Sequence, residues 1–116
     1  MDDVDVLEPV STEELSALEK YVASYFEGKG LDVTTTSYKK VNKYVGLRYY
    51  LCKVKLEMKY NERERRYIYP YVEKKDIENI QENASTLGLN LVDYSIEAST
   101  FSEHELILKL YFHPQK

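Results

Sequence analysis

The sequence predicts a single α+β domain in which two helices pack on one face of a mainly antiparallel five-stranded sheet, in the order α-β-β-β-α-β-β. Three observations predict it. The chain has 116 residues, which is the size of one domain with its own core. Two segments carry apolar residues at helical spacing, and the segments between and after them carry the alternation of strands. The motifs "GLDV" and "GLNL" follow the two helical segments, and this echo favours helices that share one face.

Two helices are expected, within residues 11–30 and 73–88. In the first, Ser11 and Glu14 have the spacing of a capping box. In the second, Asp76 stands where a cap is expected and Gly88 where the helix stops. One face of each helix is apolar, and the residues of these two faces are Leu15, Leu18, Val22 and Tyr25 or Phe26, and Ile77, Ile80, Ala84 and Leu87.

Five strands are expected, within residues 31–38, 47–60, 65–72, 89–99 and 103–113. In the second of them the apolar phase changes at Leu51–Cys52, which indicates a bulge or a segment buried on both faces. The last strand is apolar on both faces, which fits a central strand or one that pairs with another subunit. Pro70 indicates an edge or a strand end. Residues 39–46 are expected to form a basic loop, and residues 1–10 a flexible acidic arm before the domain of residues 11–116.

The hairpin around Asn61-Glu62 determines where its tyrosines point. A loop of even length puts them on the same face as the apolar row of the preceding strand, whereas an odd loop exposes them beside lysines as a basic, aromatic ladder. A two-residue loop, Asn61-Glu62, also pairs Lys59 with Glu64 and Glu57 with Arg66, which have opposite charges, and a four-residue loop shifts the pairs but keeps the faces. We therefore expect these side chains in the core: Tyr67, Tyr69 and Tyr71.

Charge is unevenly distributed along the chain, although the net charge is only −4. Residues 33–76 hold twelve bases, five acids and eight of the twelve tyrosines, whereas residues 1–32 and 77–116 are acidic. Such asymmetry can indicate a polyanionic partner. If nucleic acid is that partner, the expected contacts are Lys39, Lys40, Lys43, Lys53, Lys55, Lys59, Arg63, Arg65 and Arg66.

Enzyme chemistry finds little support in the sequence. There is no glycine-rich phosphate loop, and Cys52 lies in an apolar row, as a buried structural cysteine does. His104 and His113 are an odd number of residues apart, so a regular strand places them on opposite faces and they should not share a metal. We expect neither a catalytic site, nor a metal, nor a cofactor.

A non-enzymatic protein-interaction module is the function expected first. It would act as a homodimer, with an unknown protein as a further partner and with an accessory or regulatory role. The interface is expected on the last strand, at Ile107, Lys109 and Tyr111, because that strand is apolar on both faces. The alternative is nucleic-acid binding by the basic, tyrosine-rich residues 33–76. No apolar run reaches the roughly eighteen residues of a membrane span, and the acidic N-terminus does not resemble a signal peptide, so a cytoplasmic protein without a membrane partner is expected.

Overall fold

A computed structural model describes residues 4–98 and 104–115 of the chain. Its elements follow one another as β1 (Asp5–Pro9), α1 (Glu13–Glu27), β2 (Asp32–Asn42), β3 (Gly46–Glu57), β4 (Lys59–Asn61), β5 (Arg66–Ile68), α2 (Lys74–Thr86), β6 (Leu89–Ala98) and β7 (Glu105–Pro114).

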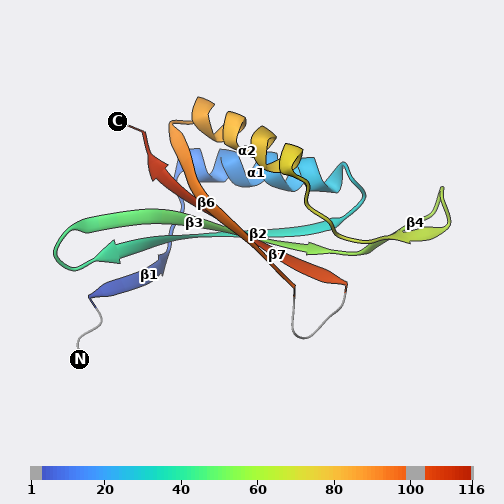
Figure 1. The fold of residues 1–116 in the computed structure, drawn as a ribbon, viewed down its shortest axis with the longest axis horizontal. Coiled ribbons are helices and arrows are strands. Elements are labelled where there is room, and N and C mark those ends of the chain that lie inside the picture. Colours follow the sequence, from blue (N-terminus) through green and yellow to red (C-terminus); the bar gives the residue numbers. More distant parts are fainter. Residues whose placement is uncertain (1–3, 99–103, 116) are drawn as a thin grey trace.

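Within these residues the main sheet has five antiparallel strands in the order β1-β2-β3-β7-β6. Both helices cover the same face of this sheet, and β4 and β5 form a separate two-stranded ribbon that extends away from it (Figure 1). The predicted α+β class is confirmed, as are the antiparallel sheet and the shared helical face. Membership of the sheet differs from the prediction, because β1 belongs to it and the segment 65–72 does not.

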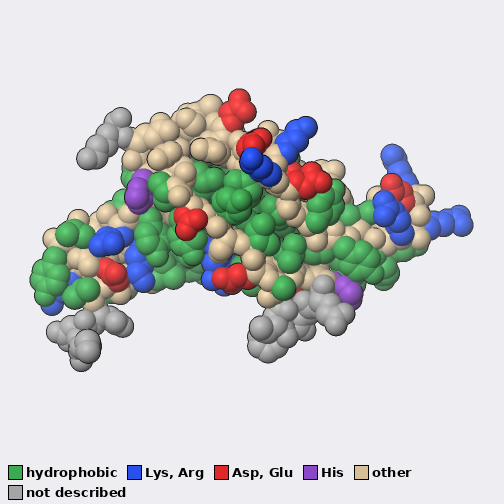
Figure 2. Space-filling view, in the orientation of Figure 1, with side chains coloured by type: hydrophobic (Ala, Val, Ile, Leu, Met, Phe, Trp, Pro, Cys, Tyr) green, Lys and Arg blue, Asp and Glu red, His purple; other side chains and the backbone are tan. Residues whose placement is uncertain are grey.

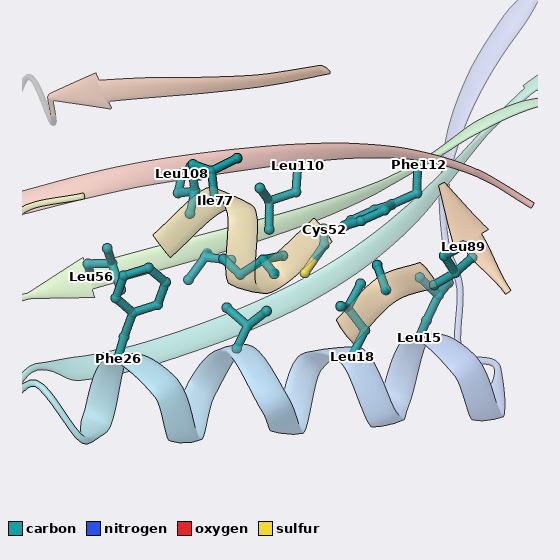
Figure 3. Packing of buried hydrophobic residues seen from close by; sticks show 14 of the residues in the cluster. Leu15, Leu18, Phe26, Cys52, Leu56, Ile77, Leu89, Leu108, Leu110 and Phe112 are labelled. Carbon is teal, nitrogen blue, oxygen red and sulfur yellow. The ribbon is translucent and has the colours of Figure 1, made fainter. Parts of the chain in front are cut away.

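The core lies between the helices and one face of the sheet (Figure 3). Each helix presents apolar residues three or four positions apart to this core, as the spacing predicts. The central strands contribute every second residue. Its fully buried members include Leu18, Val22, Phe26, Cys52, Val54, Leu56, Ile80, Leu108, Leu110 and Phe112.

The N-terminal segment forms a strand, where the sequence analysis expected a flexible arm. Residues Asp5–Pro9 pair with β2, and Glu8 lies opposite Lys39, with an ion pair of 3.7 Å between them. Lys39 and Lys40 therefore lie within β2, and the expected basic loop shortens to the turn after Asn42. The strand forms because β2 is long enough to offer it a free edge, and a distant partner of this kind leaves little trace in a local sequence pattern.

The ribbon corrects the prediction for the tyrosines. Asn61 pairs with Arg66 across residues 62–65, so the loop has even length, as preferred. The chain nevertheless leaves the sheet after Glu57, and the ribbon twists away from the core. Consequently Tyr67, Tyr69 and Tyr71 are about half exposed, at 49%, 54% and 47%, and the prediction that they lie in the core is wrong. Only Ile68 of β5 packs against the core.

The structure explains both strand segments with unusual apolar patterns, the change of phase at Leu51–Cys52 and the last strand, which is apolar on both faces. Leu51 and Cys52 are both buried, at 7% and 0% exposure, so the change of phase marks burial on both faces of β3. The register shift in this region lies at Arg48, between the Tyr49 and Leu47 pairs. Strand β7 pairs with β3 on one side and with β6 on the other, so its apolar character is that of a central strand.

Candidate functional site

One face of the sheet carries no helix, and we call it the open face. Side chains alternate along each strand, so the neighbours of the core residues on β2, β3 and β7 point to this face. The register aligns them in rows across the three strands. From β7 through β3 to β2, these rows are Tyr111–Leu51–Tyr38, Lys109–Lys53–Thr36 and Ile107–Lys55–Thr34.

Three tyrosines form a partly buried aromatic group on the open face. Tyr38 and Tyr111 flank Leu51 in one row, which accounts for the burial of Leu51 on a face that no helix covers. The ring of Tyr49 meets that of Tyr111 edge to face, with centroids 5.3 Å apart and planes at 77°. Each of the three rings is half-buried, so it is held in place and still presents surface to solvent.

Lysines border this group. Lys40 lies opposite Tyr49, and Lys53 lies directly opposite Lys109. Like charges that face each other across strands are destabilising. Lys109 is partly compensated by Glu97 at 3.3 Å, whereas Lys40 and Lys53 make no ion pair within the described residues. We call the whole group the open-face strip: Tyr38, Lys40, Tyr49, Leu51, Lys53, Lys109 and Tyr111.

A shallow hollow adjoins the strip. Its volume is about 280 Å³. The walls combine two ammonium groups with hydroxyl groups from β2, and a single carboxylate from β7 stands at the rim. The lining residues are Thr34, Thr36, Tyr38, Lys53, Lys55, Glu105 and Ile107.

The predicted nucleic-acid contacts divide into three groups. Lys40, Lys53 and Lys55 point to the open face, although Lys55 is drawn to Glu57 and Glu105 at 3.9 and 3.6 Å. Lys39 and Lys43 lie near the β2–β3 turn, Lys39 on the helical side and Lys43 over the ring of Tyr44. The rest lie along the ribbon, where Arg66 pairs with Glu64 at 2.7 Å: Lys59, Arg63, Arg65 and Arg66. The fold thus does not gather the nine into one surface.

Sequence reasoning did not single out Tyr38 and Tyr49, because it looked for exposed rings only in the hairpin, and it named Tyr111 only as an interface residue of the last strand. The apolar phase of Tyr49 and Leu51, opposite to that of Cys52, was the available signal, and it marks the second face of β3. The ribbon tyrosines are exposed as well, and a cleft of about 580 Å³ separates them from the end of α1. Lys29 lies in this cleft, 4.6 Å from the ring centroid of Tyr71.

Asp76 lies at the centre of a buried polar cluster near this cleft. Its carboxylate accepts hydrogen bonds from Lys29 Nζ at 2.7 Å and Tyr25 Oη at 2.6 Å, and also from the backbone N–H of Glu73 at 2.8 Å. Burial alone would disfavour the charged form, but these donors together hold the pKa of Asp76 below its ordinary value. The hydrogen bond that Tyr25 Oη donates to Asp76 raises the pKa of Tyr25. This cluster joins the end of α1 to the start of α2. Asp76 was expected to cap α2, but Glu73 is the N-cap, and Asp76 is the N3 residue of the capping box that the two form.

Strand β6 forms one edge of the sheet, and within the described residues its outer side is unpaired. The side chains of Val92, Tyr94 and Ile96 on this strand are 43–46% exposed, and Tyr94 and Ile96 lie opposite Leu110 and Leu108, on the helical face of the sheet. Hydrophobic side chains gather across the middle of Figure 2, where β6 runs below α2 in Figure 1. The predicted interface residues of β7 point elsewhere, since Ile107, Lys109 and Tyr111 lie on the open face.

Groups that could carry catalysis are sparse in the part of the chain that the structure describes. Cys52 is fully buried, and its burial raises the thiol pKa to about 12. The ring of His104 contacts Tyr69, while His113 lies at the far end of β7 opposite Asn90. Among residues 4–98 and 104–115, no three His, Cys, Asp or Glu side chains converge as a metal site requires.

None of the helices described is long and apolar enough to cross a membrane. Comparison with protein-family models, with curated proteins and with solved structures finds no match to this chain.

Proposed function

We propose that this protein is a non-enzymatic interaction module that associates with a second copy of itself through the edge of β6. The observation that carries the proposal is a ten-residue edge strand whose outer side has no partner strand within the described residues and which bears three half-exposed apolar side chains. A long edge strand offers a row of unpaired N–H and C=O groups, and proteins usually block such an edge with charges, proline or a cover. On β6, the exposed apolar side chains of Val92, Tyr94 and Ile96 alternate with two exposed acids, Asp93 and Glu97, and the register with β7 shifts at Val92, so this edge combines apolar surface with charge.

The opposite edge of the sheet is less suited to pairing. Strand β1 has five residues, and Pro9 has no N–H to donate. Strand β7 is already paired on both sides. The expected homodimer is therefore proposed on β6 in place of the last strand.

A register for the pair follows from charge. Two antiparallel copies of β6 centred on Tyr94 place Asp93 opposite Ser95 of the second copy and Ile96 opposite Val92. A centre at Ser95 would set Asp93 against Glu97, and like charges directly opposite are destabilising. The two-fold axis is therefore proposed at Tyr94, where the apolar residues of both copies meet.

Cysteine cross-linking tests this register. Directly paired residues of antiparallel strands have Cα atoms about 4.5–5.5 Å apart, within the range of a disulfide. Under mild oxidation, Tyr94→Cys is expected to form a covalent dimer. The native Cys52 gives a clean background, because it is buried and its thiol pKa is raised to about 12.

Ser95→Cys is the matched control, since the proposed register holds two copies of residue 95 apart. A cross-link at 95 and none at 94 would contradict the register.

Light scattering of the unmodified chain is expected to give a dimer mass, and Ile96→Lys a monomer mass. Added salt should tighten the dimer, because it screens Asp93 and Glu97 on both copies. A monomer mass for the unmodified chain at every concentration would overturn self-association.

A further inference from the structure

A second surface is independent of β6. Pairing at the edge would extend the sheet sideways and leave its open face uncovered. The open-face strip lies on β2, β3 and β7 and combines half-buried aromatic rings with lysines. We propose that this strip binds a single-stranded nucleic acid, with bases stacked on the tyrosines and phosphates held by the lysines.

The rings support base stacking. Every base has a flat face, and stacking on tyrosine requires a ring that is exposed and fixed in position. Tyr49 and Tyr111 hold each other edge to face at 5.3 Å, and Tyr111 and Tyr38 flank the buried Leu51. Unpaired bases reach such a surface, whereas bases inside a duplex do not, so the inferred ligand is single-stranded. In RNA-recognition motifs, aromatic side chains on a four-stranded sheet stack about two or three bases in this way.

The lysines support binding of phosphate. Lys53 faces Lys109 across the strands and has no acid partner in the described residues. A polyanion would relieve this repulsion, because it supplies the missing negative charge. The hollow beside Lys53 also offers Lys55 and the hydroxyl groups of Thr34 and Thr36. The strip therefore carries charge complementary to a phosphate chain, while the chain as a whole has a net charge of −4.

The acids of the open face set the direction of the path. Asp32, Glu57 and Glu105 form a row at the ribbon end of the hollow, whose lining includes Glu105, and a phosphate chain would be repelled there. Asp93 and Glu97 of β6 lie opposite Tyr111 and Ile107 and border the strip on the β6 side. At the end of the strip away from the ribbon, the β2–β3 turn exposes Lys43, Tyr44 and Arg48. A bound strand is thus expected to run from the hollow across the tyrosines toward this turn.

Fluorescence polarisation with a labelled oligouridylate, an oligothymidylate and a duplex of the same length tests the proposal at low and high salt. Both single strands are expected to bind the unmodified chain, and the duplex much more weakly. Tyr49→Ala should weaken binding about tenfold, whereas Tyr49→Phe, which keeps the ring, should retain it. Lys53→Gln should lower the slope of log affinity against log salt by about 0.7, the value for one phosphate contact on a single strand.

Matched controls come from the ribbon and from α2. Tyr67→Ala removes a more exposed tyrosine outside the strip, and Lys75→Gln removes an exposed lysine, so neither should change the affinity. Circular dichroism of each variant establishes that it is folded. Failure of the unmodified chain to bind either single strand at low salt would overturn the proposal. Equal losses for Tyr67→Ala and Tyr49→Ala, or equal binding of the duplex, would also overturn it.

Discussion

The two faces of β3 have opposite characters, although they belong to the same twelve residues. On the helical face, Cys52, Val54 and Leu56 are fully buried beneath α1 and α2. On the open face, Lys53 and Lys55 alternate with them and remain in contact with solvent. Burial therefore commits one face to stability and leaves the other available for a ligand.

The difference between the faces also shows in their charges. On the helical side, the buried acid Asp76 is paired with Lys29 and Tyr25. The open face sets Lys53 against Lys109, an arrangement that costs stability. Natural sequences are locally consistent except at functional sites, so the unfavourable pair supports the proposal that the open face binds a ligand.

The largest effect is expected from truncating equivalent leucines on the two faces. Leu110→Ala empties a site in the main core and should lower the free energy of unfolding by about 4 kcal/mol. Leu51→Ala removes a leucine covered only by neighbouring side chains, which can relax into the space, and should cost about 1–2 kcal/mol. Urea unfolding measures both. Equal losses would contradict the view that only one face carries the core.

A smaller effect is expected from the buried acid. Asp76→Asn leaves Lys29 without its partner and should cost about 3 kcal/mol at neutral pH. Because the pKa of Asp76 is lowered in the folded state, its contribution is present above the ordinary aspartate pKa of about 3.9 and is lost as the pH falls through the folded value. The variant should therefore lose less stability than the parent on acidification below about pH 4.

Urea unfolding across acidic pH measures this difference. Asp32→Asn serves as its control, because the Asp32 side chain is 62% exposed and reaches Lys59 only at 3.9 Å. A parallel acid dependence for Asp76→Asn and the parent would show that Asp76 does not carry the linkage.

The smallest effect should have the opposite sign. Lys53→Gln removes one of two facing charges and is expected to raise the free energy of unfolding by about 0.5 kcal/mol at low salt. The gain should vanish at high salt, where the repulsion is screened. Thermal unfolding at two salt concentrations measures it. A loss of stability at low salt would mean that Lys53 has a structural role, contrary to the assignment of the open face to binding.

The elements with strong local patterns were predictable from the sequence. The residues of α1 and α2 that face the core were identified by their spacing, because a helix records burial within its own turns. The N-cap moved only from Ser11 to Thr12, whose hydroxyl accepts from the N–H of Leu15. The fold class followed from the order of these elements.

Features that depend on distant partners were not predictable. Strand β1 exists because β2 offers it an edge. The hairpin had the preferred even loop, yet its tyrosines were misplaced, since alternation cannot reveal that the chain leaves the sheet after Glu57. The strip combines residues from β2, β3 and β7, which are adjacent only in the folded sheet. The sequence analysis named Lys40 and Lys53 of the strip as possible nucleic-acid contacts because of their charge. It named Lys109 as an interface residue because the last strand is apolar on both faces.

The place of β7 has a consequence for how the chain is synthesised. Strand β7 follows β6 in the sequence, yet it lies between β6 and β3 in the sheet. During translation, β2 and β3 can pair as soon as they emerge, whereas β6 has no neighbour until β7 has been made. Until then both sides of β6 are free, and exposed unpaired strands promote aggregation. The sheet is therefore expected to close only after β7 has been made, and β6 should be the segment that chaperones protect until then.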